Sequence, residues 1–152
     1  MKKIFALLLA IIMVLSLAAC DSRKDKGSTL IYGSGDYDSI NPIMNEHCEI
    51  KHLLFDSLVK LDKNGDPVAS LAESWTYDDA TLTYTFKLRS DVKWHDGEKF
   101  TAYDVKFTIE AIMNPDTGAE NYPNYMEIKE IKVNSDTEIA FILSEPNYAL
   151  LD

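Results

Sequence analysis

Three side chains near residue 50 have the chemistry of metal ligands. His47, Cys48 and His52 lie in one short stretch, and Cys48 and His52 stand four positions apart, a spacing that places two side chains on one face of a helix. Imidazole nitrogens and thiolates are common ligands of zinc and nickel. Two ligands on one helical turn supply only half of a tetrahedral site, so we interpret the stretch as a semi-exposed helix start with one buried thiol. We expect no resident metal and no cofactor.

Two predicted loops partly match known ligand-binding motifs. Residues 62–66 (Asp-Lys-Asn-Gly-Asp) begin like a calcium loop, with Glu73 at the twelfth position, but Pro67 stands where that loop needs a glycine. Residues 33–35 (Gly-Ser-Gly) lack the third glycine of a dinucleotide loop, and Asp36 would repel a pyrophosphate. We interpret the first loop as a hairpin turn and expect no nucleotide site.

No group of side chains indicates catalysis. His95 lies in residues 94–97 (Trp-His-Asp-Gly), a pattern typical of a turn, and no Ser/His/Asp or Cys/His arrangement is evident. A hydrolase that depends on His95 or His47 is the least favoured interpretation. We expect no catalytic residue and no enzymatic activity.

Composition narrows the class of protein. The 152 residues suit one domain, and 15 Lys and Arg against 25 Asp and Glu give a net charge of −10. A nucleic-acid-binding protein needs a basic surface, so this balance argues against one, and it also disfavours docking on anionic lipid. Two cysteines are too few for a disulfide scaffold.

The N-terminus predicts export. Lys2 and Lys3 precede an apolar run over residues 4–17, and no acid occurs before Asp21. Residues 1–19 therefore fit a secretory signal peptide, and the run is short for a spanning helix, which needs about 20 apolar residues. The alternative is an N-terminal anchor that stays attached. Residues 17–20 (Leu-Ala-Ala-Cys) resemble a bacterial lipobox, which implies lipidation of Cys20, and the polar residues 20–29 predict a flexible tether.

The first half of the mature chain predicts a series of short strands, turns and helices. Residues 30–32 predict a strand and residues 41–42 (Asn-Pro) a turn. A helix is expected from Glu46, with one apolar face made of Ile50, Leu53, Leu54 and Leu58. Residues 59–68 predict a hairpin around the turn at residues 62–67, and residues 71–75 predict a short helical turn or bend.

The second half predicts two hairpins and a helix. Polar and apolar residues alternate over residues 75–88 around a turn at residues 78–80. Thr101 and Asp104 have the spacing of a capping box, and the helix that follows should end at residues 114–115 (Asn-Pro). A second hairpin is expected over residues 128–143. Clustered strands without strict alternation with helices favour an α+β fold with a mainly antiparallel sheet.

The most specific pattern spans residues 71–105. It reads LAESW at residues 71–75, LTYTFKLR at residues 82–89 and VKWHDGEKFTAYDV at residues 92–105. This region resembles the signature of the extracellular solute-binding proteins of family 5, the oligopeptide- and dipeptide-binding components of ABC importers. The flanks agree as well: residues 39–42 (SINP), residues 54–59 (LFDSLV) and residues 143–146 (LSEP).

The resemblance implies an architecture and a binding region. The chain would be the N-terminal part of a periplasmic-binding-protein-like type II fold that lacks the second lobe, with the first strand and loop of lobe one at residues 30–45 and an incomplete accessory subdomain at residues 46–152. Trp75 and Trp94 would be structural anchors, and Arg89 would pair with an acid or a carbonyl. The positions expected near a ligand are Ser34, Asp36, Tyr37, Asn45, Glu46, His47 and Cys48.

The resemblance also implies partners. The protein would be a lipoprotein on the outer face of the bacterial cytoplasmic membrane that delivers peptides to ABC permease subunits. Glu46 would receive a cationic group, and Asn45 would bond peptide amides. Family members are several-fold longer and close two lobes around the ligand, so this chain alone is not expected to bind peptide usefully. Alternatives are another cargo (nickel, heme or an oligosaccharide) and a surface lipoprotein that acts as a protein-interaction module.

Overall fold

The computed structural model describes residues 30–33, 39–44 and 50–151. The chain divides into two compact units, residues 1–33 and 34–152. In the first unit, residues 30–33 belong to no helix or strand, and the side chain of Ile31 is 91% exposed. The strand predicted at residues 30–32 is therefore not formed. A strand exists only where a neighbouring strand takes up its backbone hydrogen bonds, and these residues pair with none.

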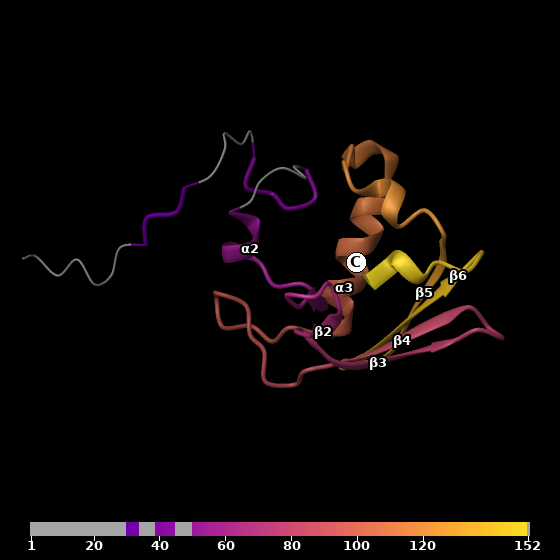
Figure 1. Ribbon diagram of the computed structural model, residues 1–152. Helices are drawn as coiled ribbons and strands as arrows, with labels where there is room; N and C mark the ends of the chain where they lie inside the picture. Colours follow the sequence, from indigo (N-terminus) through magenta and orange to yellow (C-terminus); the bar gives the residue numbers. More distant parts are fainter. Residues whose placement is uncertain (1–29, 34–38, 45–49, 152) are drawn as a thin grey trace, which may run out of the picture. The chain divides into compact units, whose positions relative to one another are not determined.

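After the turn at residues 39–44, the next described elements of the second unit are a short helix and a small hairpin (Figure 1). Helix α2 is the single turn Lys51–Leu54, and its last bond runs from the N–H of Phe55 to the carbonyl of Lys51. The predicted helix is thus shorter than expected, and its apolar face breaks before Leu58, which instead packs against the main core. Strands β1 (Val59–Leu61) and β2 (Pro67–Ala69) pair antiparallel, which confirms the predicted hairpin.

The turn between β1 and β2 is held by one carboxylate. Asp62 Oδ1 accepts hydrogen bonds from the N–H groups of Asn64 at 2.7 Å and Asp66 at 2.9 Å. The backbone bond from Asp66, then that from Asn64, holds the pKa of Asp62 below its ordinary value. Gly65 adopts a φ of +85°, which glycine tolerates without strain. The loop is therefore a hairpin turn, as the sequence predicts.

A four-stranded antiparallel sheet forms the centre of the second unit. Its strands are β3 (Ala72–Asp78), β4 (Thr83–Leu88), β5 (Ile128–Ser135) and β6 (Glu138–Leu143), in the spatial order β3-β4-β6-β5. Both predicted hairpins are confirmed. Of the helical turn or bend predicted at residues 71–75, a bend is present at Leu71 and the helical turn is wrong. Residues from Ala72 onward form strand β3, where Trp75 pairs with Phe86 of β4, and cross-strand packing outweighs the local pattern.

Helix α3 (Ala102–Met113) lies on one face of this sheet (Figure 1). Its capping box is formed, since Asp104 Oδ2 accepts bonds from the N–H of Thr101 at 2.7 Å and from its hydroxyl at 3.0 Å. The helix ends at Asn114, before Pro115. The core between helix and sheet contains Val105, Ile109, Ile112, Tyr84, Phe86, Leu88, Ile139 and Phe141. The α+β prediction of an antiparallel sheet with helices is borne out at this level.

The described residues of the second unit also include three 3₁₀ turns: η2 (Pro115–Thr117), η3 (Tyr122–Asn124) and η4 (Tyr148–Leu151). The C-terminal turn η4 is tied to the sheet by two tyrosines. Tyr148 donates its hydroxyl to Asp79 at 3.1 Å, and Tyr84 donates to the carbonyl of Asn147 at 3.1 Å. Over the described ranges, no helix is long and apolar enough to cross a membrane.

Candidate functional site

The residues expected near a ligand fall outside the described part of the chain. These are Ser34, Asp36, Tyr37, Asn45, Glu46, His47 and Cys48, and the expected lipidation site Cys20 falls outside it as well. Their roles therefore stay predictions. The structure describes the segment that joins the two predicted binding stretches, residues 39–44, and what that segment packs against.

The joining segment is an ordered turn. Ser39 Oγ accepts a bond from the N–H of Asn41 at 3.0 Å, and Asn41 Oδ1 accepts one from the N–H of Ile43 at 3.2 Å. The N–H of Met44 donates to the carbonyl of Asn41 at 3.1 Å. The Asn-Pro turn predicted from the sequence is thus confirmed, and Pro42 restricts its backbone further.

This turn is anchored on the segment that follows α3. The N–H of Glu120 donates to the carbonyl of Ile43 at 3.2 Å, and Ile43 and Ala119 both pack against the main core. The adjacent pocket has a volume of about 290 Å³ and is lined by Ile112, Asn114, Pro115, Gly118, Ala119 and Tyr122. No pattern in the sequence predicted this pocket. The signal for it that the sequence contains is the helix-ending Asn-Pro pair followed by Gly118.

The pocket has an apolar wall and a polar edge. Asn114 Oδ1 caps η2 by accepting a bond from the N–H of Asp116 at 3.0 Å, and Gly118 turns the chain with a φ of +66°. Among the described residues, the buried Oδ1 of nearby Asn121 has no hydrogen-bond partner. Such an oxygen can accept a bond from water or from a bound group. The arrangement can hold a side chain, but it contains no pair of groups for acid–base chemistry.

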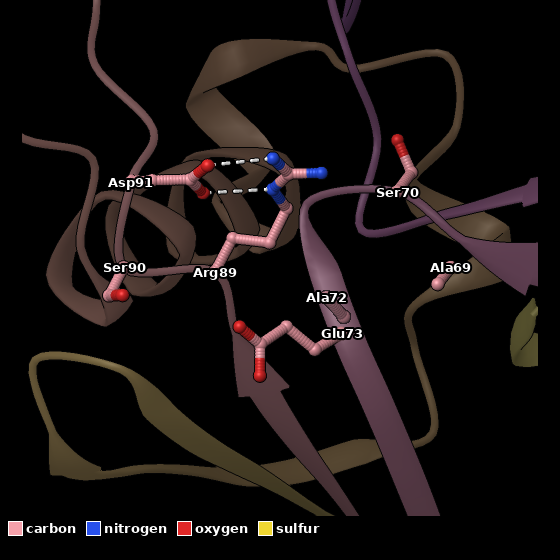
Figure 2. Close-up of a pocket in the computed structure, with 7 residues that line it drawn as sticks. All are labelled: Ala69, Ser70, Ala72, Glu73, Arg89, Ser90 and Asp91. Atoms are coloured by element: carbon pink, nitrogen blue, oxygen red, sulfur yellow. Dashed lines mark hydrogen bonds and ion pairs between the residues drawn. The ribbon is translucent and has the colours of Figure 1, made fainter.

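A second, polar pocket of about 260 Å³ lies where β3 begins and β4 ends (Figure 2). Arg89 reaches Asp91 with two parallel bonds, Nε to Oδ1 at 3.0 Å and Nη2 to Oδ2 at 2.8 Å. This pairing raises the pKa of Arg89 and lowers that of Asp91. Glu73, which also lines the pocket, pairs with Lys87 at 3.3 Å. Arg89 therefore pairs with an acid within the chain, as the family resemblance implies.

The signature residues around His95 form a tight turn. The N–H of Trp94 donates to the carbonyl of Glu98 at 2.8 Å, and the N–H of Gly97 donates to the carbonyl of Trp94 at 3.0 Å. Gly97 has a φ of +94°, so the position favours glycine. Trp94 packs edge-on against Phe100 and stays partly exposed, while Trp75 is half-buried against the core. Both tryptophans serve packing at the edge of the core.

The metal-ligand candidates are not assembled in the described ranges. His52 is exposed on α2, and its possible partners His47 and Cys48 lie outside those ranges. Within residues 30–33, 39–44 and 50–151, no three His, Cys, Asp or Glu side chains gather as a metal site requires.

Comparison with known proteins gives one consistent result. Residues 66–152 match the family described as bacterial extracellular solute-binding proteins, family 5 Middle. The chain is similar to the oligopeptide-binding protein AppA of Bacillus subtilis, with 30% identity over 93% of this chain and 30% of AppA. It thus spans less than a third of that relative.

Solved structures agree with the sequence match. The fold is similar to that of NikZ from Campylobacter jejuni in complex with Ni(L-His), with a TM-score of 0.74 and 36% identity over 78% of this chain and 24% of that one. It is also similar to the structure of AppA from Bacillus subtilis in complex with a nonapeptide, with a TM-score of 0.68 and 30% identity over 74% of this chain and 23% of AppA.

Proposed function

This chain belongs to family 5 of the bacterial extracellular solute-binding proteins, and on that premise we propose that it forms part of the peptide receptor of an ABC importer. The observation that carries the choice of peptide is the similarity to AppA, which extends over 93% of this chain in sequence and includes a structure with a bound nonapeptide. Membership of a solute-binding family agrees with the expectation that the chain is not an enzyme.

The proposal assigns the ligand contacts to the two stretches that flank the ordered turn. Ser34, Asp36 and Tyr37 precede the turn, and Asn45 to Cys48 follow it. Asn45 would bond peptide amides, and Glu46 would receive a cationic group such as a peptide amino terminus. Peptide capture of this kind works through backbone bonds, with side-chain pockets left tolerant.

Residues 30–45 would be the first strand and loop of lobe one, and residues 46–152 its accessory subdomain. A ligand is held well only when a site buries most of its surface, which in binding proteins requires two lobes that close on a hinge. Because the chain spans about a quarter of NikZ and less than a third of AppA, we expect purified residues 21–152 to bind peptides only weakly. Saturable micromolar binding in a titration with a peptide mixture would contradict this expectation.

The decisive experiment is to purify the native product that carries this sequence from the membranes of its source cells. Its intact mass and the molecules released by acid are then measured by mass spectrometry. We expect a species well above 17.2 kDa that releases peptides. A species that carries neither peptide nor metal supports the protein-interaction module instead, and a species that carries heme or an oligosaccharide supports those cargoes.

Nickel is the second candidate cargo, because the TM-score of 0.74 and 36% identity relate this chain to a structure with Ni(L-His). His47, Cys48 and His52 would supply ligand atoms or contact the bound chelate. Nickel retained by the native product after dialysis, and lost in a His47→Ala variant, would favour this candidate over peptide.

The proposal places the protein outside the cytoplasm, held to the membrane by a lipid on Cys20 and in contact with permease subunits. A thioether-linked diacylglyceryl group and an acyl chain together anchor a protein stably. Cys20→Ser should release the protein from the membrane fraction into the soluble fraction. If the variant stays bound to the membrane, the retained N-terminal anchor becomes the better interpretation.

A further inference from the structure

The turn between β1 and β2 contains a pair of residues that is open to a covalent change. Asn64 is followed by Gly65, and none of the other asparagines in the sequence precedes a glycine. Both residues are exposed. A Cβ added at Gly65 would meet no atom within 4 Å, so water and base have free access to its backbone nitrogen. Because glycine has no side chain to block the approach, this nitrogen can attack the asparagine side chain that precedes it.

The reaction is a deamidation whose only co-reactant is water. The backbone nitrogen of Gly65 loses its proton and bonds to Cγ of Asn64, the bond from Cγ to Nδ2 breaks, and Nδ2 takes up a proton and leaves as ammonia. The product is a five-membered succinimide ring. Water then opens this ring at either carbonyl and leaves an aspartate or an isoaspartate at position 64. A neutral amide has been exchanged for a carboxylate, and nothing has been oxidised or reduced.

In the folded turn, both reacting groups are held by Asp62. The N–H of Gly65 donates to the backbone carbonyl of Asp62 at 3.0 Å, and Nδ2 of Asn64 donates to Asp62 Oδ2 at 3.2 Å. Asp62 Oδ1 fixes the backbone on either side by accepting bonds from the N–H groups of Asn64 and Asp66. The proton that must leave is thus engaged, and the amide that must be attacked is bound to a carboxylate. The closed turn therefore slows the reaction.

We propose that Asn64 is a site of spontaneous deamidation and that Asp62 controls its rate by holding the turn closed. The reaction proceeds from the open turn, so its rate is that of an unconstrained Asn-Gly pair multiplied by the fraction of time for which the turn is open. Opening is accessible here, since neither β1 nor β2 contains a buried residue and a two-stranded hairpin is marginally stable at best. The proposal does not depend on the nature of the cargo.

The change loosens the hairpin and leaves the four-stranded sheet intact. A carboxylate at position 64 has no proton to donate to Asp62, and it stands in sequence between Asp62 and Asp66, so three like charges meet in one turn. An isoaspartate also adds one carbon to the backbone, which changes the length of chain that the closed turn requires. Both products hinder closure of the turn, so the open form accumulates as the molecule ages.

The test compares the full chain with two variants at position 62. Asp62→Ala removes the side-chain acceptor of three hydrogen bonds, and Asp62→Asn is the matched control, because its amide oxygen still accepts the two backbone bonds. Circular dichroism checks that each variant is folded. The proteins are incubated in a mildly alkaline buffer beside a synthetic peptide of residues 59–69, which has no fixed turn. Digestion and mass spectrometry then follow position 64 and separate aspartate from isoaspartate.

We expect Asn64 of the wild-type chain to react at least tenfold more slowly than the peptide, since hydrogen bonds to a charged group shift an equilibrium by roughly tenfold or more. Asp62→Ala should bring the rate close to that of the peptide, and Asp62→Asn should stay close to the wild type. Asn134, which is exposed in β5 and precedes a serine, should stay unmodified.

Three results overturn the proposal: a wild-type rate equal to that of the peptide, an unchanged rate in a folded Asp62→Ala variant, or an earlier reaction at Asn134. If Asp62→Ala does not fold, the comparison of the wild type and Asp62→Asn with the peptide decides, because neither needs that variant. Loss of peptide or nickel binding by the protein would change the proposed cargo but not these rates.

Discussion

Two regions of the second unit differ in how they bury their apolar side chains. The sheet–helix region, residues 72–143, contains every buried hydrophobic residue in the part of the chain that the structure describes. The leading region, residues 50–69, includes α2, β1 and β2 and has no buried residue, although it includes Leu53, Phe55 and Leu61. Both regions have regular backbone hydrogen bonds. The difference shows that local patterns suffice to form a turn or a hairpin, while a core needs partners from far along the chain.

The contrast also bears on function. The leading region and the turn before it flank the stretches expected to meet a ligand, and the sheet–helix region is a folded support. Binding residues often lie on segments of low local stability that a rigid scaffold positions. Four measurements on purified residues 21–152 test this division.

The largest effect is expected from Phe86→Ala. The Phe86 side chain is 2% exposed and its ring lies 5.3 Å from that of Phe141. Its removal leaves a cavity and should lower the free energy of unfolding by about 3–5 kcal/mol. The matched change Phe55→Ala, in a side chain that is 41% exposed, should cost less than about 1 kcal/mol. Urea unfolding followed by tryptophan fluorescence measures both, and equal losses would show that the two regions share one core.

The second-largest loss of stability is expected from removing the N-terminal cap of α3. Asp104→Ala removes the acceptor of both the N–H and the hydroxyl of Thr101, and should lower the free energy of unfolding by about 1–2 kcal/mol. Lys106→Ala, which breaks only an exposed ion pair with Glu110, is the control and should cost about 0.2–0.5 kcal/mol. Thermal unfolding by circular dichroism separates the two. No difference between the variants would mean that the helix is held by packing alone.

Substitution of two glycines should give a smaller difference in unfolding stability. Gly97 has a φ of +94°, so Gly97→Ala strains the turn between Trp94 and Glu98 and should cost about 1 kcal/mol. A Cβ added at Gly33 meets no atom within 4 Å, so Gly33→Ala should leave the unfolding midpoint unchanged. The midpoint of urea unfolding measures both changes. A neutral Gly97→Ala would argue that the turn relaxes into another conformation.

The smallest effect on stability is expected from lowering the pH. Asp62 and Asp78 both cap turns, and the backbone bonds from Asp66 and Ala80 are the largest causes of their lowered pKa values. A carboxyl whose pKa is lowered by folding stabilises the fold above its ordinary value of 3.8, and that contribution is lost as the pH falls through the lowered pKa. Both turns should therefore loosen below about pH 4.

The β1–β2 turn should open first, because no buried residue supports it, and the β3–β4 turn should hold longer on its sheet. Amide proton exchange at Asn64, Asp66 and Ala80 between pH 5 and pH 2 follows the two turns separately. In Asp62→Asn the amide oxygen still accepts the bonds, so the acid sensitivity of the first turn should disappear. Simultaneous opening of both turns would mean that they belong to one cooperative unit.

Predictions that rest on local chemistry are confirmed. The spacing of Thr101 and Asp104 predicts a helix start, residues 62–67 predict a turn, and the alternation in residues 82–88 predicts a strand with one buried face. Each depends on residues a few positions apart, whose contacts form in almost any fold. Family membership follows from the same signature region, which the comparisons bear out.

Predictions that need distant partners are wrong or incomplete. Residues 71–75 carry a pattern compatible with a helical turn, yet pairing with β4 makes residues 72–75 part of a strand. The apolar face expected from Ile50 to Leu58 breaks after Leu54, since no partner buries it. The turn after β3 ends on Leu82 with a φ of +50°, a conformation that its sequence does not suggest. The backbone bond between Glu120 and Ile43 likewise joins segments that lie far apart in the chain.

By itself, then, the sequence determined the hairpins, the capped helix and the family, because these depend on short-range spacing and on a specific motif. Tertiary structure alone decided the strand order β3-β4-β6-β5 and the place of the C-terminal turn. Thr83 pairs with Ile142, and Tyr148 reaches Asp79, across stretches of chain that no local pattern can join. Such contacts form only when burial of apolar area offsets the entropy of closing a long loop, and that balance belongs to the whole fold.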